Sequence, residues 1–208
     1  MEFIKGLALG LTLQLSVGPV FFAVLHKAAV EGSREAFKMT LGVAVVDACY
    51  IAVSFTGIAA LLQVKALQSV ILAAGAAVLV YFGLRYIRNA PAGNEELPAK
   101  PAQPARKIFL GGSFAYGLKL TAVNPLTIIF WSGTFGALLA SRILAGPAEA
   151  ALTAAGCVSA TLLFLGLISF FGRFLPLRRN PRLSVICDCA VGAVLIIFGC
   201  IMVYKLVG

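Results

Sequence analysis

Asp47 is the residue whose type and position could carry chemistry most directly, because it lies about a third of the way into a strongly apolar run. In a helix, Tyr50, Ser54 and Gly57 share its face. If the run crosses a bilayer, a carboxylate there costs roughly 3 kcal/mol and should face the interior of a helix bundle. Burial also disfavours the ionised form, which suits a proton carrier or a site for a substrate ammonium group. The alternative is a structural carboxylate paired with a neighbour such as Lys119.

Two prolines interrupt two other apolar runs near their midpoints, within the segments Gln14–Pro19 and Thr121–Pro125. Proline has no backbone N–H and clashes with the preceding turn, so each helix should kink or break there. Backbone groups freed at membrane depth must face protein or a water-filled cavity. Two breaks at corresponding positions in two halves indicate a transport site. The predicted substrate-binding residues are Gln14, Ser16, Gly18, Pro19, Asp47, Thr121, Asn124 and Pro125.

The side chains around the breaks predict separate roles. Gln14 and Ser16 are polar near mid-span, so we expect them to line a cavity. Gly6 and Gly10 lie on the same helical stripe as Gln14, and they suit close helix packing as well as a site. Asn124 can satisfy backbone groups at the break, or offer a donor and an acceptor to a polar solute. The helix ends created by the breaks could face a substrate carboxylate.

Two other ionisable residues are expected to lie at the edges of the apolar runs. His26 is the only histidine, and it stands at the end of the first run, where we predict a loop. Asp188 is one turn inside the last run, where we predict an interfacial position.

The composition is that of an integral membrane protein. The chain has 208 residues, of which 61% are hydrophobic and 12% charged, with a mean hydropathy of +0.99. A soluble domain carries about twice that charged fraction. Loop lysines and arginines account for the net charge of +9 without a nucleic-acid partner. The five cysteines lie in apolar runs and are interpreted as small packing residues, not metal ligands. No catalytic motif and no cofactor motif is present, so the sequence does not predict an enzyme.

Six apolar runs are each near the roughly 20 residues that cross a bilayer. They are Phe3–Leu25, Thr40–Leu62, Leu67–Ile87, Gly112–Ala140, Ala150–Phe171 and Leu183–Val203. The proline-rich segment around 89–108 is predicted to be a linker between two three-helix repeats, residues 1–88 and 109–208. We therefore predict an all-α membrane protein of six transmembrane helices, with the first and fourth broken.

The two halves also resemble each other in sequence. A shift of 106 places Pro19 on Pro125, and a shift of 116 aligns 77–83 with 193–199 at five identical positions of seven. Because each half has an odd number of spans, the copies would insert with opposite orientation, as an inverted repeat. Twelve of the 17 lysines and arginines follow the first, third and fifth runs, which predicts that these loops are cytoplasmic and both termini are outside.

In these features the chain resembles the LysE/RhtB family of amino-acid exporters. The resemblance rests on the order and spacing of Gly18-Pro19, the acid Asp47, the linker 89–107 and Asn124-Pro125, and it covers essentially the whole chain. The family usually has Pro-Gly-Pro in the first motif and Asn-Pro-Lys in the second. This chain has Val17 in place of the first proline and Leu126 in place of the lysine. The missing lysine removes a charge near the site. The resemblance implies export of amino acids or similar small metabolites across the inner (cytoplasmic) membrane, driven by protons or the membrane potential.

Other functions remain open at this point. A divalent metal-ion (cadmium-type) exporter of the same superfamily is the main alternative, although Asp47, Asp188, Cys187 and Cys189 are few ligands for a metal pathway. A thiol redox relay would need cysteines on the two broken runs, which contain none. A non-transporting scaffold would not explain the paired prolines. The expected partners are the small-molecule substrate and the lipid bilayer, and the glycine stripes also allow a homodimer.

Overall fold

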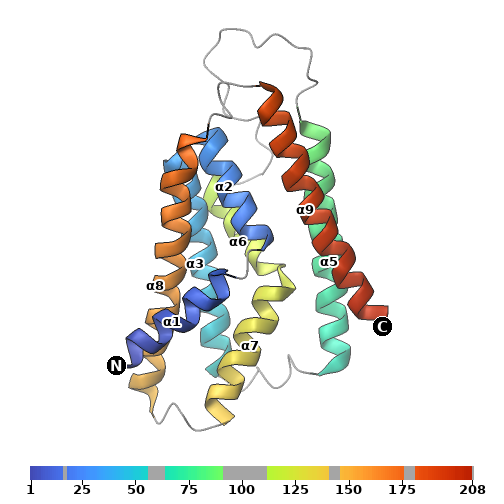
Figure 1. Ribbon diagram of the computed structural model, residues 1–208. Coiled ribbons are helices and arrows are strands. Elements are labelled where there is room, and N and C mark those ends of the chain that lie inside the picture. Colours follow the sequence, from blue (N-terminus) through green and yellow to red (C-terminus); the bar gives the residue numbers. More distant parts are fainter. Residues whose placement is uncertain (16–17, 56–63, 91–111, 141–145, 176–180, 208) are drawn as a thin grey trace.

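The computed structural model describes residues 1–15, 18–55, 64–90, 112–140, 146–175 and 181–207, and the regular elements in these ranges are all helices (Figure 1). In order they are α1 (Glu2–Leu15), α2 (Pro19–Glu31), α3 (Ser33–Phe55), α5 (Lys65–Asn89), α6 (Gly112–Ala122), α7 (Pro125–Ala140), α8 (Pro147–Phe171), the short η1 (Gly172–Phe174) and α9 (Pro181–Val207). The all-α prediction is thus confirmed for the described part of the chain. Residues 91–108 of the predicted linker lie outside the described residues.

Both predicted prolines mark the start of a helix. α1 ends at Leu15 and α2 begins at Pro19, with the two axes bent by 81°. α6 ends at Ala122 and α7 begins at Pro125. Proline suits the first helical position, because its missing N–H would have no partner there and its φ is already helical. Figure 1 shows both breaks near the middle of the molecule, where the ends of α1, α2, α6 and α7 come together.

Two helix pairs, α1 with α8 and α3 with α6, pack backbone to backbone at glycines. A Cβ atom on Gly6 would overlap the carbonyl oxygen of Thr153, and one on Gly117 would overlap that of Met39. A Cβ atom on Gly10 would likewise come too close to the carbonyl oxygen of Cys157 on α8, at 2.8 Å. In lipid, helices associate through van der Waals packing that small residues permit. Gly6 and Gly10 are therefore packing residues of the α1–α8 pair.

A single methyl group at Gly117 is expected to destabilise the fold, because neither contacting backbone can move without disturbing its helix. We expect Gly117→Ala to lower the free energy of unfolding in detergent by about 2–3 kcal/mol. Gly133→Ala on α7 is the matched control, since a Cβ there meets no atom within 4 Å. The control should be neutral or more stable, because alanine has the higher helix propensity. Equal unfolding midpoints for the two variants would contradict the packing argument.

Three of the described helices are long enough and apolar enough to cross a membrane. These are Ser33–Phe55, Pro147–Phe174 and Arg182–Tyr204, and the bent pair α1–α2 makes a fourth if it is counted as one span. α5 and α9 lie side by side along their lengths and form one flank of the molecule (Figure 1). Buried side chains of α5 and α9, including Leu79 and Leu195, join Met39 and Tyr116 in one apolar cluster that connects this flank to the other helices.

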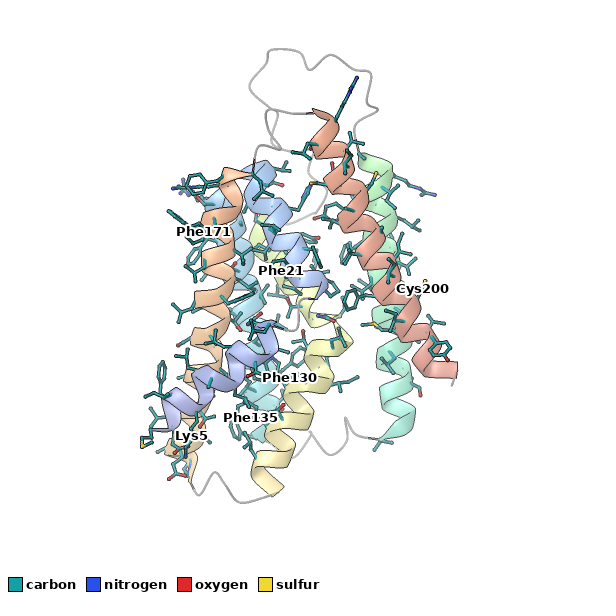
Figure 2. The ribbon with its side chains drawn as sticks, viewed as in Figure 1. Lys5, Phe21, Phe130, Phe135, Phe171 and Cys200 are labelled. Atoms are coloured by element: carbon teal, nitrogen blue, oxygen red, sulfur yellow. The ribbon has the colours of Figure 1, made fainter. Side chains whose placement is uncertain are left out.

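The cysteines fit the packing prediction only at Cys157, which is buried and donates from Sγ to the carbonyl oxygen of Gly6 at 3.2 Å. Cys49 and Cys200 are exposed on the outer faces of their helices, and Figure 2 shows Cys200 on α9. Within the described ranges, no three histidine, cysteine, aspartate or glutamate side chains gather as a metal site would require. The metal-ion alternative therefore gains no support from the structure.

Candidate functional site

A cavity of about 440 Å³ lies where the ends of α1, α2 and α7 meet the middle of α3. Its walls contain five of the eight predicted site residues: Gln14, Gly18, Asp47, Thr121 and Asn124. The structure thus brings together residues of α1, α3 and α6 and the residues just before α2 and α7, which are up to 110 positions apart in the chain. The volume is within the roughly 300–1,000 Å³ typical of small-molecule sites.

The other three predicted residues have different positions. Pro19 is buried as the first residue of α2 and is not among the residues that line the cavity. Pro125 is the first residue of α7, and its side chain lies outside the described part of the structure. Ser16 also lies outside the described residues. The two prolines therefore shape the site through the helix starts that they create.

Asp47 is the one acidic side chain among the described residues that line this cavity, and it is only 2% exposed. Its Oδ1 atom accepts a hydrogen bond from Nε1 of Trp131 at 3.0 Å, and Oδ2 accepts one from Oγ1 of Thr161 at 2.8 Å. Both donors are neutral, so the carboxylate is positioned without a neutralising charge. Lys119, the candidate partner, is exposed on α6. The structure thus gives Asp47 two polar neighbours in place of the ion pair that we considered.

A short chain of hydrogen bonds connects the end of α1 to Asp47. Nε2 of Gln14 donates to Oγ1 of Thr161 at 2.8 Å, and the single hydroxyl proton of Thr161 is donated onward to Asp47. An amide NH₂ can only donate and a hydroxyl has one proton, so the direction of this chain is fixed. A change in the position of α1 would therefore act on Asp47 through α8.

Asn124 caps the start of α7 with its side chain. Its Oδ1 accepts from the backbone N–H of Leu126 at 3.2 Å, and its Nδ2 donates to Oγ1 of Thr127 at 3.0 Å. Capping of this kind satisfies backbone donors that a helix start leaves open. Gly18 occupies the same position before α2, with an extended backbone and no side-chain cap. The first turn of α2 is therefore less completely capped than that of α7.

Thr121 is the least satisfied polar residue of the site. Its side chain is fully buried at the end of α6 and borders the cavity, yet Oγ1 has no hydrogen-bond partner among the described residues. A buried hydroxyl without a partner costs about 1–3 kcal/mol. An orphaned group of this kind beside a cavity is expected to meet a ligand or water there.

Sequence reasoning missed Trp131 and Thr161. Trp131 is the only tryptophan in the chain and is fully buried on α7, while Thr161 is fully buried on α8. A lone indole N–H in an apolar run is a donor that must find an acceptor, and Asp47 is an acceptor that lies within another apolar run. That signal was available for Trp131. No pattern distinguishes Thr161 from the other hydroxyl residues of α8.

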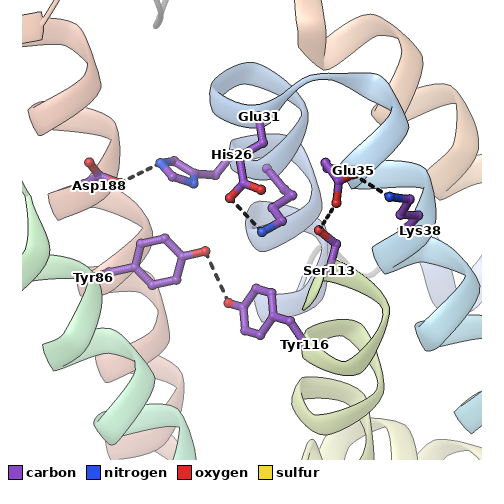
Figure 3. Close-up of polar contacts among 9 residues, drawn as sticks. His26, Glu31, Glu35, Lys38, Tyr86, Ser113, Tyr116 and Asp188 are labelled. Carbon is purple, nitrogen blue, oxygen red and sulfur yellow. Dashed lines mark hydrogen bonds and ion pairs between the residues drawn. The ribbon is translucent and has the colours of Figure 1, made fainter. Parts of the chain in front are cut away.

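A second polar cluster joins residues of α2, α5, α6 and α9 (Figure 3). His26 lies inside α2 and is buried, so the loop position predicted for it is wrong. Its Nε2 atom is 2.6 Å from Oδ1 of Asp188 on α9. The hydroxyl groups of Tyr86 and Tyr116, 3.2 Å apart, make another link between α5 and α6. The cluster thus connects the α5–α9 flank to the helices around the cavity.

Asp188 lies seven residues after the start of α9 at Pro181, and its side chain, which is 13% exposed, contacts His26 of α2. The interfacial position predicted for it stays a prediction. Nε2 of His26 makes no aligned hydrogen bond with the described residues, so the contact is an attraction between close charges when the imidazole is protonated. Nearby, Glu35 of α3 accepts from Ser113 of α6 and pairs with Lys38.

Comparison with known proteins identifies the group to which this arrangement belongs. The family model described as "LysE type translocator" matches residues 11–206. A protein of Bacillus subtilis named "Putative amino acid efflux protein YcgF" is 29% identical over 138 residues, which cover 66% of this chain and 64% of that protein. The chemotactic transduction protein ChpE of Pseudomonas aeruginosa is 28% identical over 148 residues, covering 71% and 70%.

A third relative matches over a longer region. The uncharacterized membrane protein YahN of Escherichia coli K12 is 26% identical over 191 residues, covering 90% of this chain and 82% of that protein. No solved structure matches the chain significantly. The family match extends across both helix breaks, Asp47 and the α5–α9 flank. The chain therefore belongs to the LysE family of translocators, which are multi-pass membrane proteins.

Proposed function

We propose that this translocator exports amino acids or related small metabolites across the inner (cytoplasmic) membrane, as a secondary transporter driven by protons or the membrane potential. The observation that carries the proposal is the cavity between the two helix breaks, with Asp47 as the one acid among its described lining residues. A mid-membrane cavity between half-helices is the arrangement by which several transporter folds bind substrate. The amino acid efflux named for the Bacillus relative is in line with it.

We further propose that the chain has six spans arranged as an inverted 3+3 repeat, residues 1–88 and 109–208, joined by the linker 89–108. Reciprocal glycine contacts support this arrangement. Gly83 of α5 contacts Gly192 of α9, and Gly199 contacts Ala76. A shift of 116 takes Ala76 of α5 to Gly192 of α9, and Gly83 to Gly199. The shift therefore exchanges the two contacts, as a two-fold axis requires.

The other helix pairs follow the same rule. Gly117 contacts the carbonyl oxygen of Met39, and Gly6 contacts that of Thr153. A shift of 111 takes Gly6 of α1 to Gly117 of α6, and a shift of 114 takes Met39 of α3 to Thr153 of α8. Each contact therefore maps onto the other. The prolines align at a shift of 106 instead, so Pro19 follows Gly6 by five residues more than Pro125 follows Gly117. The two breaks would then lie at similar depths in the membrane, although the two prolines do not occupy equivalent positions in the two halves.

The orientation that we propose follows from the loop lysines and arginines, which place the ends of α2, α5 and α8 in the cytoplasm. The cluster of His26 and Asp188 would then lie on the cytoplasmic side of the cavity. In this scheme Asp47 binds a substrate ammonium group or carries the coupling proton, and the first turns of α2 and α7 face a carboxylate. A homodimer is a further proposal, for which the exposed apolar helix faces provide surface.

Efflux from proteoliposomes tests the proposal. Vesicles containing the purified protein are loaded with labelled amino acids or with cadmium, and release is compared with that from protein-free vesicles. We expect amino-acid release only with the protein present, and faster release when a pH gradient or a potassium-valinomycin potential is imposed. Release of cadmium alone, or no release of any amino acid, would contradict the exporter assignment. Release unaffected by either gradient would contradict the coupling.

A further inference from the structure

The charge content of the cavity narrows the kind of solute that it can hold. Asp47 is its one charged side chain among the described lining residues, which include neither lysine nor arginine nor histidine. Much of the remaining wall is apolar and is formed by Leu13, Val20, Phe21, Val43, Leu126 and Phe130. Figure 2 shows Phe21 near the middle of the molecule, close to the break between α1 and α2. The cavity therefore has one anionic point in a largely apolar wall.

The polar groups near the helix starts favour an anionic group of the ligand. Gly18 and Val20 of α2, and Leu126 and Thr127 of α7, bring the first turns of both helices to the cavity wall. Each helix start carries about half a positive charge. Thr121 is an independent observation, because its buried Oγ1 has no partner among the described residues and could donate to a carboxylate oxygen.

Asp47 retains capacity for a ligand ammonium group. A carboxylate offers about four lone-pair positions, and the described donors, Trp131 and Thr161, occupy one on each oxygen. Asp47 and Val43 are one turn apart on α3 and both line the cavity. A bound ammonium group would thus contact the acid with the apolar side chain of Val43 beside it.

From these groups we propose that the cavity selects neutral α-amino acids with apolar side chains, with Thr121 as a specificity-determining residue that binds the α-carboxylate. Asp47 binds the α-ammonium group, and Leu13, Phe21 and Phe130 surround the side chain. This inference rests on the proposed export function and names its substrate class.

The same geometry disfavours charged amino acids. The second ammonium group of lysine would have to lie against leucine, valine and phenylalanine, because no second acid is among the described lining residues. The second carboxylate of glutamate would have no basic side chain to meet there. Burying an unpaired charge costs far more than burying an apolar group of the same size. Leucine or phenylalanine leaves no charge unpaired.

The test measures export by proteoliposomes loaded with leucine, phenylalanine, lysine or glutamate, using wild type, Thr121→Val and Thr153→Val. Valine keeps the shape of threonine and removes the hydroxyl group. Thr153 is the matched control, since its Oγ1 is also buried without a partner among the described residues, but it lies at the α1–α8 contact and not on the cavity. Folded protein is measured for each variant by its thermal unfolding midpoint.

We expect leucine and phenylalanine to leave the vesicles, and lysine and glutamate to be retained. Thr121→Val should raise the KM for leucine roughly ten-fold or more, the loss of one hydrogen bond to a charged group, while Thr153→Val leaves KM unchanged. Faster export of lysine or glutamate would overturn the substrate class and leave amino-acid export standing. Equal KM values for the two variants would overturn the role of Thr121. Retention of all four amino acids would overturn both proposals.

Discussion

Asp47→Asn abolishes export while leaving folded protein in the membrane: this is the result expected if the one acid among the described lining residues of the cavity binds the ammonium group or the coupling proton. Asparagine has nearly the same shape and can still accept the hydrogen bond from Trp131. What it removes is the charge, together with the Oδ2 acceptor of the Thr161 hydroxyl group. Loss of one partner of a buried charge pair costs about 3–5 kcal/mol, so transport should fall at least about 100-fold. Initial efflux rates from proteoliposomes provide the measurement.

Two comparisons separate this charge effect from damage to the site. Thr161→Val removes one donor to Asp47 but leaves the carboxylate, so export should be reduced and not lost. Trp131→Phe removes the other donor, with the same expectation. The amount of folded protein is checked for each by gel filtration in detergent. If Asp47→Asn exported at the wild-type rate, Asp47 would be a structural carboxylate, the alternative that the sequence left open.

His26→Ala and Asp188→Ala are each expected to lower the free energy of unfolding by about 3–5 kcal/mol, because each leaves a buried partner unpaired. The two side chains are only 9% and 13% exposed and join α2 to α9. The double variant should cost clearly less than the sum of the single ones, since neither charge is then left alone. The measurement is a double-mutant cycle of denaturant-induced unfolding in detergent micelles.

The matched control for this cycle is Lys5→Ala. Lys5 pairs with Glu2 at 2.7 Å within α1, and its side chain is 60% exposed. Exposed pairs between neighbouring turns of one helix contribute little to stability, so the unfolding midpoint should not change. Strictly additive effects of the His26 and Asp188 substitutions would show that the two side chains do not interact, and the link between α2 and the α5–α9 flank would then be purely apolar.

The features that sequence predicted well are those with a local physical cause. Pro19 and Pro125 start new helices because proline cannot continue an old one, whatever surrounds it. A mid-span acid such as Asp47 must turn inward, since lipid offers nothing to a carboxylate. The cavity follows from these constraints together, because freed backbone and buried acid need the same interior space. Their roles in transport stay predictions until export is measured.

The features that sequence missed depend on which face of each helix turns inward. In soluble proteins a polar face marks the outside, but lipid-facing and buried faces here are equally apolar, so periodicity carries little information. Thr161 looks like its neighbour Ser159, which is only half-buried and is bonded to its own helix. His26 was misplaced because hydropathy alone ended the first run at Leu25, six residues before α2 ends at Glu31. Which residues of different helices contact each other, such as His26 and Asp188, is determined only when the helices pack together.

The glycine contacts have a consequence for synthesis of the chain at the ribosome. α1 packs on α8 and α6 packs on α3, so each half covers the first helix of the other. The face of α1 that carries Gly6 must wait for Thr153, about 150 residues later, which takes roughly 10–30 s at typical rates of elongation. Neither half can complete its packing during its own translation. The two halves of the chain therefore form one folding unit, and co-expressed halves should reach the native state only by assembling with each other.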